Sequence, residues 1–252
     1  DDLFLLRSGV IDRASWLELI GETLTNVRKT PGRQVQSLSE SSFDAWIKYY
    51  RQDENTPNAV VSYYTKGALF GLALDLTLRA GGKATLDAVM QALWQRHGLT
   101  GLGVGDEDIR RIAEELSGLS LKRFFADYTD GTRELPLERL LATAGLRLEW
   151  IPDPKAKHGV DLGIRTRVEN NEVVLAAVHP GGAAHAAGLS AGDTLVALDG
   201  LRITQATFDA LLARQRPGNT VGVHAFRRDE LLQTTVTLAP PVADTARLTP
   251  AS

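Results

Sequence analysis

The spacing of apolar residues changes once along this 252-residue chain, and that change constrains the fold more than any other feature. In residues 1–148, apolar side chains recur every three or four positions, which is the period of an amphipathic helix. Beyond residue 158 they form short runs separated by glycine-containing turns, which is typical of strands. The sequence therefore predicts a multi-domain protein, with an all-α unit followed by a compact α+β unit.

The helical half contains clear start and stop signals. Asp12 and Thr85 each precede a segment with helical periodicity, and both are suitable N-cap residues. The dipeptides Pro31-Gly32 and Gly81-Gly82 follow such segments and predict where they end. Residues 60–82 read "VVSYYTKGALFGLALDLTLRAGG", so we expect a helix there that is buried on nearly all sides and begins beside two tyrosines.

Composition argues against several classes of protein. The net charge is −3 at pH 7 and the sequence has no basic stripe, which argues against nucleic-acid binding. The chain has no cysteine, which excludes disulfides and thiolate metal ligands. Asp75 and Arg79 interrupt the most apolar segment, so we expect no membrane span. The opening "DDLFLLRSG" lacks a start Met and a basic leader, so we interpret the chain as a piece cut from a longer protein.

One stretch of the second half carries a long, ordered motif. It reads "VHPGGAAHAAGLSAGDTLVALDGLRI" and resembles the PDZ signature of bacterial proteases and their relatives. In this motif a short helix of small residues ends at a glycine, a Gly-Asp turn leads into a strand, and an Asp-Gly turn reverses the chain. The matching positions are Pro180, Ala183, Ala184, Ala187, Gly188, Leu189, Gly192, Asp193 and Gly200.

The motif and the change of period together predict the domain boundaries. We expect the helical unit at residues 1–148, a linker at 149–158, the PDZ domain at 159–241 and a C-terminal tail at 242–252. The linker is expected where two prolines and two lysines interrupt both kinds of periodicity.

A PDZ fold implies a groove between a strand near residues 162–168 and a helix near 207–214, where a peptide can add as an extra strand. The loop "DLGI" would present its amides to a terminal carboxylate, although Asp161 opposes an anion there. The peptide-binding residues implied by this groove are Leu162, Gly163, Ile164, Phe208 and Leu211. The alternative is a PDZ domain that packs on its neighbour and binds no free peptide.

The helical half looks like the C-terminal portion of a catalytic domain. The segments that carry this resemblance are "LLRSGVID", "TPGRQVQSLSESSFDAWIKYY", "YTKGA" and "YTDGTRELPLERLLATAGL". They are similar to the glycyl aminopeptidase family of zinc metallopeptidases, of the gluzincin type. These enzymes join a thermolysin-like catalytic domain to a C-terminal PDZ domain. The resemblance implies a full-length parent that removes N-terminal glycine or alanine from peptides.

The same resemblance gives one tyrosine a catalytic role. Tyr64 has the spacing of the family's Y-x-K-G segment, in which the phenol donates a hydrogen bond to the oxyanion of the transition state. Tyr63 lies one residue earlier and would point about 100° away on a helix. Three neighbours are expected to bind substrate: Lys66, Gly67 and Arg33. The alternatives are that both tyrosines lie at the edge of the core, that Lys66 anchors the segment by an ion pair, and that Arg33 forms a structural ion pair.

Zinc is implied for the full-length parent but not for this chain. A gluzincin needs two histidines one helical turn apart with a glutamate between them. None of the histidines is followed by glutamate, and no two are four positions apart; they are His97, His158, His179, His185 and His224. We therefore predict no metal site here, and no peptidase activity from the chain alone. The compartment stays open between bacterial cytoplasm and periplasm.

A non-catalytic helical adaptor with a peptide-binding PDZ domain is the competing hypothesis. The peptidase hypothesis predicts that the Tyr64 hydroxyl faces an open, apolar surface. The adaptor hypothesis predicts that Tyr64 is buried and hydrogen-bonded within the helical unit. The expected partners are peptides and the missing N-terminal catalytic part. We also expect self-association through the exposed face, but neither nucleic acid nor membrane.

Overall fold

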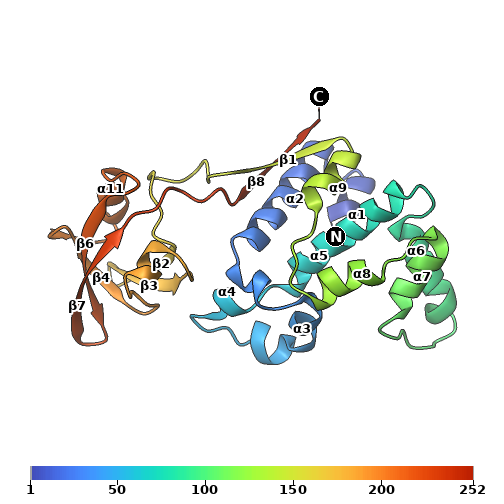
Figure 1. The fold of residues 1–252 in the computed structure, drawn as a ribbon, viewed down its shortest axis with the longest axis horizontal. Helices are drawn as coiled ribbons and strands as arrows, with labels where there is room; N and C mark the ends of the chain where they lie inside the picture. The colour runs from blue at the N-terminus through green and yellow to red at the C-terminus, as the bar shows by residue number, and fades with distance from the viewer. Residues whose placement is uncertain (1, 252) are drawn as a thin grey trace.

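The computed structural model describes residues 2–251 and has two lobes joined by extended segments (Figure 1). The first lobe is mainly helical and the second is built on a β-sheet, as the sequence predicted. The helices of the first lobe are α1 (Asp2–Arg7), α2 (Arg13–Arg28), α3 (Leu38–Phe43), α4 (Thr56–Ala59), α5 (Tyr63–Ala80), α6 (Leu86–Leu93), α7 (Asp108–Ser117), α8 (Lys122–Phe125) and α9 (Leu137–Thr143). Short turns of 3₁₀ or π type connect them: η1 (Pro31–Gln34), η2 (Ala45–Tyr49), η3 (Trp94–Gly98) and η4 (Ala126–Asp130).

The predicted helix starts are confirmed by their side-chain caps. The Asp12 carboxylate accepts a hydrogen bond from the Ser15 amide at 2.8 Å, at the start of α2. The Thr85 hydroxyl accepts one from the Ala88 amide at 3.2 Å, at the start of α6. Such a bond satisfies one of the free amides of the first helical turn. Both caps lie within three residues of the group they bind, so local sequence is sufficient to predict them.

The long helix α5 runs through the centre of the helical lobe (Figure 1). Leu69 and Ala73 belong to a hydrophobic cluster shared with α2, α9 and β1. Leu74 and Leu78 belong to a second cluster shared with α6 and α7. A helix that packs on two sides needs apolar residues around most of its circumference, which explains the nearly unbroken apolar run.

Two strands complete the helical lobe, which differs from the all-α unit that we predicted. β1 (Leu146–Ile151) pairs antiparallel with β8 (Thr245–Pro250), with Leu148 opposite Leu248. Apolar side chains of both strands pack on the cluster that contains α2 and α9, so burial holds this pair in place. The predicted linker at 149–158 therefore begins inside a strand. The predicted tail at 242–252 contains β8, which returns to the helical lobe.

The second lobe is a five-stranded antiparallel sheet with one short extra strand. Its strands are β2 (Ile164–Glu169), β3 (Glu172–Val178), β4 (Thr194–Leu198), β5 (Leu201–Arg202), β6 (Thr220–Arg227) and β7 (Glu230–Thr237). The order is β2-β3-β4-β6-β7, and β5 pairs with β4. Two short helices, α10 (Ala183–Ala186) and α11 (Phe208–Ala213), contribute to the lobe's single core. This α+β arrangement confirms the fold class predicted for the second half.

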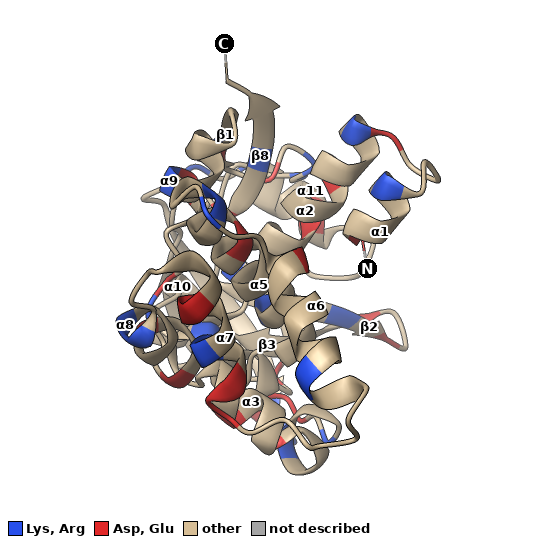
Figure 2. Cartoon of the chain, turned by 90° about the vertical axis from the view of Figure 1, so that its right-hand side faces the viewer, with Lys and Arg blue, Asp and Glu red and all other residues tan. Residues whose placement is uncertain are grey.

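The lobes touch through α4. The Asn58 side-chain amide donates to the carbonyl of Val178 at 2.9 Å, and its oxygen lies 3.1 Å from His179 Nδ1. Val178 ends β3 of the second lobe, so this contact fixes one point between the lobes in addition to the chain connections. Figure 2 shows basic and acidic residues interspersed over the viewed face. Within residues 2–251, no helix combines the length and the apolar character needed to span a bilayer.

Candidate functional site

Five aromatic side chains gather where η2 meets the first turn of α5. They are Trp46, Tyr49, Tyr50, Tyr63 and Tyr64. The ring centroids of Tyr63 and Tyr64 are 4.2 Å apart, and those of Trp46 and Tyr50 are 5.2 Å apart. The Ser62 hydroxyl caps α5 by accepting from the Thr65 amide, which fixes the direction in which the helix begins. We call these five residues the aromatic cluster.

The hydroxyl of Tyr50 joins the two tyrosines of α5. Its oxygen lies 2.9 Å from that of Tyr64 and 3.0 Å from that of Tyr63. Hydrogen bonding with Tyr50, and next with the adjacent Tyr63, lowers the pKa of Tyr64. Hydrogen bonding to Tyr50 and Tyr64 raises the pKa of Tyr63. Of the three phenols, Tyr64 is the one whose negatively charged form its neighbours stabilise.

The aromatic cluster lies on an open surface. The Tyr64 side chain is 58% exposed. Phe43, Trp46 and Ile47 are more exposed still, so the surface around Tyr64 is largely apolar. An open apolar surface is what the peptidase hypothesis predicted, and the burial predicted by the adaptor hypothesis is absent. The hydroxyl does have a partner within the lobe, namely Tyr50. Sequence reasoning missed this residue, and only the aromatic character of the segment "IKYY" signalled it.

Lys66 lies on another side of α5 from Tyr64 and is buried, with 5% of its surface exposed. Its ammonium donates to the carbonyls of Arg33 at 3.2 Å and Gln36 at 3.3 Å. Burial lowers the pKa of Lys66, and the Glu134 carboxylate partly opposes that shift. The anchoring ion pair suggested for Lys66 is therefore wrong. Within residues 2–251 no carboxylate lies within 4.0 Å of the ammonium, and backbone carbonyls of η1 and of the turn that follows it are its acceptors instead.

Arg33 and Gly67, the two remaining substrate-binding predictions, differ in their surroundings. Arg33 Nε donates to Glu134 Oε1 at 2.8 Å, which matches the alternative of a structural ion pair. A Cβ added at Gly67 would first meet Leu38 Cδ1 at 3.8 Å, an ordinary van der Waals distance. The described chain therefore does not itself require glycine at 67. The structure brings Arg33 and Lys66 together, behind the exposed face that carries Tyr64.

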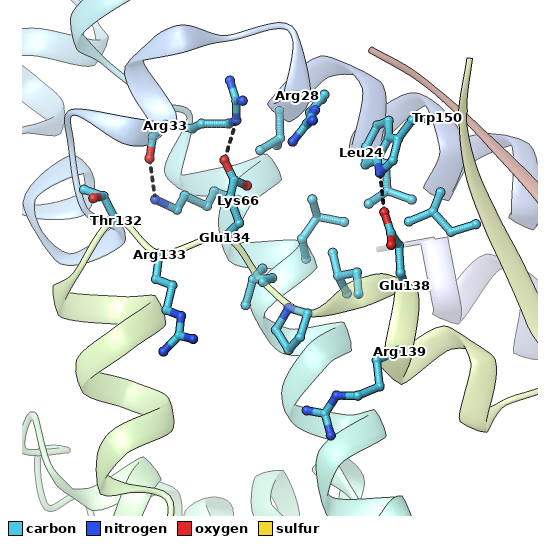
Figure 3. A pocket seen from close by; sticks show the side chains of 16 residues that line it. Leu24, Arg28, Arg33, Lys66, Thr132, Arg133, Glu134, Glu138, Arg139 and Trp150 are labelled. Carbon is cyan, nitrogen blue, oxygen red and sulfur yellow. Dashed lines mark hydrogen bonds and ion pairs between the residues drawn. The ribbon is translucent and has the colours of Figure 1, made fainter. Parts of the chain in front are cut away.

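Arg33 and Lys66 also line a pocket between α2, η1, α5, the segment 132–139 and β1 (Figure 3). The pocket has a volume of about 470 Å³. Its floor is formed by leucine and valine side chains of the α5 core, and Trp150 of β1 forms one wall. No sequence pattern predicted this pocket, because its lining comes from five separate segments.

The structure provides no set of ligands that fits zinc. No three His, Asp or Glu side chains within residues 2–251 are grouped so that they could hold a metal ion. His97 lies against the carbonyl of Gly103, and His179 lies against Asn58 between the lobes. We therefore assign no chemical step of this chain to a metal.

In the second lobe, the predicted carboxylate-binding loop is tightly built. Gly163 has φ +70°, and a Cβ at this position would come within 2.7 Å of Gly182 Cα, so glycine is required. The carbonyl of Leu162 accepts from the Ala184 amide, and the carbonyl of Gly163 accepts from the His179 amide, both at 2.8 Å. These bonds hold the loop against the turn that precedes α10.

The amide of Gly163 already has an acceptor within the chain. It donates to Asp161 Oδ1 at 2.9 Å. The carboxylate of Asp161 thus accepts from an amide of the loop that we predicted to bind a peptide C-terminus. The sequence showed the unfavourable charge of Asp161 but not this hydrogen bond. This hydrogen bond depends on the orientation of the Asp161 side chain, which the sequence does not indicate.

The other groove residues lie along the core of the second lobe. Leu162, Phe208 and Leu211 are buried in that core, and Ile164 packs against it. β2 is at one end of the sheet, and within residues 2–251 it pairs only with β3, so its other edge has no strand partner there. Most side chains of β2 are exposed. A free strand edge beside an apolar core is the arrangement to which a peptide can add as another strand.

The two lobes together define a class: a helical lobe with an exposed tyrosine cluster, followed by a PDZ-type sheet domain. Residues 1–70 match the family described as M61 glycyl aminopeptidase, and residues 160–238 match the PDZ domain family. The predicted resemblance to glycyl aminopeptidases with a C-terminal PDZ domain is confirmed by these two matches. The first includes Arg33, Tyr64, Lys66 and Gly67.

Similar proteins of known structure or description agree with this assignment. An aminopeptidase N family protein from Idiomarina loihiensis superimposes over 100% of this chain and 45% of its own, with a TM-score of 0.90 and 36% identity. The regulator of sigma-E protease RseP from Escherichia coli is 38% identical over 88 residues, 34% of this chain and 20% of its own. RseP from Salmonella typhimurium is 31% identical over 130 residues, 51% of this chain and 26% of its own. The chain thus spans less than half the length of these proteins.

Proposed function

We propose that this chain is the C-terminal part of an aminopeptidase that removes N-terminal glycine or alanine from peptides, and that Tyr64 stabilises the transition state. The observation that supports this most directly is the position of Tyr64. It lies in the Y-x-K-G segment, at the start of a capped helix, on an open apolar surface. The likeness to an aminopeptidase N family protein supports the same reaction class.

Tyr64 would act as a hydrogen-bond donor to the oxygen on which negative charge develops. The Tyr50 hydroxyl, 2.9 Å away, can donate to the Tyr64 oxygen and leave the Tyr64 proton free for the substrate. A donor whose pKa is lowered forms a stronger bond as charge builds on the acceptor. The cap at Ser62 and the buried bonds of Lys66 hold the first turn of α5 in place, so the phenol needs little reorganisation during the reaction.

The PDZ domain would contribute a peptide-docking edge. The unpaired edge of β2 can accept an extended peptide by main-chain hydrogen bonding. The assignment of peptide docking to this edge rests on the resemblance to PDZ domains. The docked peptide would be a substrate or a regulatory segment. We propose docking at this edge as the second function of the chain, separate from the chemistry at Tyr64.

The role of Tyr64 is tested by Tyr64→Phe in the full-length enzyme, with Tyr63→Phe as the matched control. We expect Tyr64→Phe to lower kcat on an N-terminal glycine substrate roughly 10²–10³-fold, the usual effect of removing one oxyanion donor. Tyr63→Phe removes the same atom from the adjacent residue and should change kcat far less. Unchanged turnover in Tyr64→Phe would exclude Tyr64 from the mechanism. The 252-residue chain, supplied with zinc, serves as the sample that we expect to be inactive.

A further inference from the structure

We propose that the pocket between α2, η1, α5, residues 132–139 and β1 binds a small carboxylate that carries an apolar group. The inference does not depend on the proposed chemistry at Tyr64, because Tyr64 is not among the residues that line the pocket. It follows from three features of the pocket: its apolar floor, its surplus of positive charge, and the lack of carboxylate partners for several of its cations (Figure 3).

The size and floor of the pocket suit a small organic molecule. Its volume of about 470 Å³ lies within the range of typical ligand sites. The floor consists of core side chains that are each at most 9% exposed: Leu24, Val27, Leu69, Leu137 and Leu148. The Trp150 ring adds an aromatic wall, and its orientation is fixed because Nε1 donates to Glu138 Oε1 at 2.9 Å. An apolar group of a ligand would displace water from these surfaces.

Basic side chains outnumber acidic ones around the pocket. The basic residues are Arg28, Arg33, Lys66, Arg133 and Arg139, and the acidic residues are Glu134 and Glu138. Each acid is already engaged, Glu134 by Arg33 and Glu138 by the Trp150 indole. The pocket therefore presents excess positive charge, which attracts anions.

Two of the arginines have no acidic partner among residues 2–251. Arg133 pairs with Asp127, outside the pocket, at 2.8 Å. In contrast, no carboxylate of residues 2–251 lies within ion-pair distance of Arg28 or Arg139. The Arg28 guanidinium instead lies 5.0 Å from the centre of the Trp150 ring. A guanidinium over an indole is well placed to bind a carboxylate, because stacking fixes its plane while the N–H groups stay free.

Lys66 adds a buried positive charge that has no carboxylate of residues 2–251 within 4.0 Å, although Glu134 lies near enough to oppose the lowering of its pKa. A buried ammonium is costly unless a counter-charge or several acceptors surround it. Lys66 has two carbonyl acceptors, which leaves one of its three N–H groups without an acceptor in the described chain. An anion in the pocket would add counter-charge to a lining that contains both Lys66 and Arg28.

These features favour a carboxylate on an apolar body over inorganic anions. Phosphate or sulfate would use the cations but leave the leucine floor and Trp150 in contact with water. A peptide C-terminus with an apolar last residue and a free short-chain acid share the required chemistry. Both place one carboxylate near Arg28 and an aliphatic group over the floor, so the experiment includes both.

The proposal is tested by isothermal titration calorimetry on the full 252-residue chain with N-acetyl-leucine, N-acetyl-leucinamide and inorganic phosphate. The amide has the same apolar group without the charge, and phosphate has the charge without the apolar group. We expect N-acetyl-leucine to bind at least about tenfold more tightly than either, since a charge-assisted contact and apolar burial then act together. Equal affinities for N-acetyl-leucine and its amide, or for N-acetyl-leucine and phosphate, would overturn the proposal.

Variants locate the binding in the pocket. Arg28→Met keeps an aliphatic stem and removes the charge, and we expect it to weaken N-acetyl-leucine binding about tenfold. Arg13→Met makes the same change on the same helix outside this pocket, and we expect no effect. Arg139→Met repeats the test at the second arginine without an acidic partner, in case Arg28→Met does not fold. Equal effects of the pocket variants and Arg13→Met would contradict the assignment.

Two further ligands distinguish the source of the carboxylate. Tighter binding of a hexapeptide ending in leucine than of hexanoate would support peptide C-termini as the natural ligand class. The reverse order would support free short-chain acids. Failure of both to bind at millimolar concentration would overturn the proposal for either source.

Discussion

The hydroxyl oxygens of Tyr50 and Tyr64 lie 2.9 Å apart although the residues are separated by 14 positions in the sequence. η2 and α5 bring them together, and the bond links an exposed tyrosine to a second phenol that can direct its proton. Tyr50 touches Tyr64 rather than the reacting atoms in our proposal, so it is a positioning residue. This relationship allows the role of Tyr64 to be tested through a neighbour as well as directly.

Tyr50→Phe in the full-length enzyme should lower kcat roughly tenfold, because one neutral hydrogen bond is lost while the Tyr64 donor remains. The same change removes the main cause of the lowered pKa of Tyr64. Our proposal requires a protonated Tyr64 as the donor, so the alkaline limb of the pH profile of kcat should move to higher pH in this variant, toward the ordinary phenol value of about 10. A purely structural effect would lower kcat without moving this limb.

Asp161→Ala should open the PDZ loop to peptide C-termini. In the structure the Asp161 carboxylate accepts from the Gly163 amide, so a terminal carboxylate must both displace it and approach its charge. We expect Asp161→Ala to tighten binding of a free-acid peptide about tenfold while leaving its amidated form unchanged, measured by fluorescence anisotropy. Asp229→Ala removes the same charge at the exposed turn between β6 and β7 and serves as the control. Equal gains for free-acid and amidated peptides would contradict this role of Asp161.

Lys66→Met should destabilise the helical lobe by about 1–3 kcal/mol, because the buried carbonyls of Arg33 and Gln36 lose their donor. Urea unfolding at pH 7 measures this difference. Lys122→Met changes an exposed lysine on α8 and should have little effect. If the two variants unfold alike, the Lys66 bonds contribute nothing measurable.

The pH dependence of that difference has a defined sign. Burial lowers the pKa of Lys66 in the folded protein, so between that pKa and the unfolded value of about 10.4 the unfolded chain binds more protons. The folded state then gains stability as pH rises through this interval. The stability gap between the wild type and Lys66→Met should therefore widen with pH in that interval. A gap that narrows would show that the lysine is not held in a desolvating site.

Leu248→Ala should destabilise the helical lobe although it lies at the C-terminal end of the chain, beyond the PDZ domain. Leu248 of β8 packs on the core shared by α2, α5 and α9. Because the side chain is half-buried, we expect a loss of about 1–2 kcal/mol in the free energy of unfolding. Val242→Ala, at an exposed position in the same segment, should be neutral. Differential scanning calorimetry distinguishes the variants by their Tm.

Local patterns predicted the features that depend on neighbouring residues. The caps at Asp12 and Thr85, the apolar helix α5 and the order of the PDZ elements follow from residues a few positions apart. The pairing of β1 with β8 was missed because it joins Leu148 to Leu248 across the whole PDZ domain. The short alternating segment at 245–250 gave no signal of its partner. Contacts of this kind depend on which surfaces the rest of the fold leaves open.

The candidate sites divide in the same way. The Y-x-K-G motif singled out Tyr64, and the peptidase hypothesis predicted that its hydroxyl faces an open, apolar surface. Its partner Tyr50, the acceptor of Gly163, and the pocket at Arg28 and Lys66 all arise from side chains that only the fold brings together. The carbonyl partners of Lys66 were also missed, since backbone acceptors leave no mark in a sequence.

The ribbon formed by β1 and β8 has a mechanical consequence. The chain leaves the helical lobe through one strand and returns through the other, so the PDZ domain is tethered at both ends and cannot swing freely as it would on a single linker. A peptide bound at β2 would pull on two paired strands that pack beside α2, and one of them, β1, contributes Trp150 to the pocket at Arg28 and Lys66. A force on one lobe would thus be transmitted to the other as twisting of the short ribbon formed by β1 and β8.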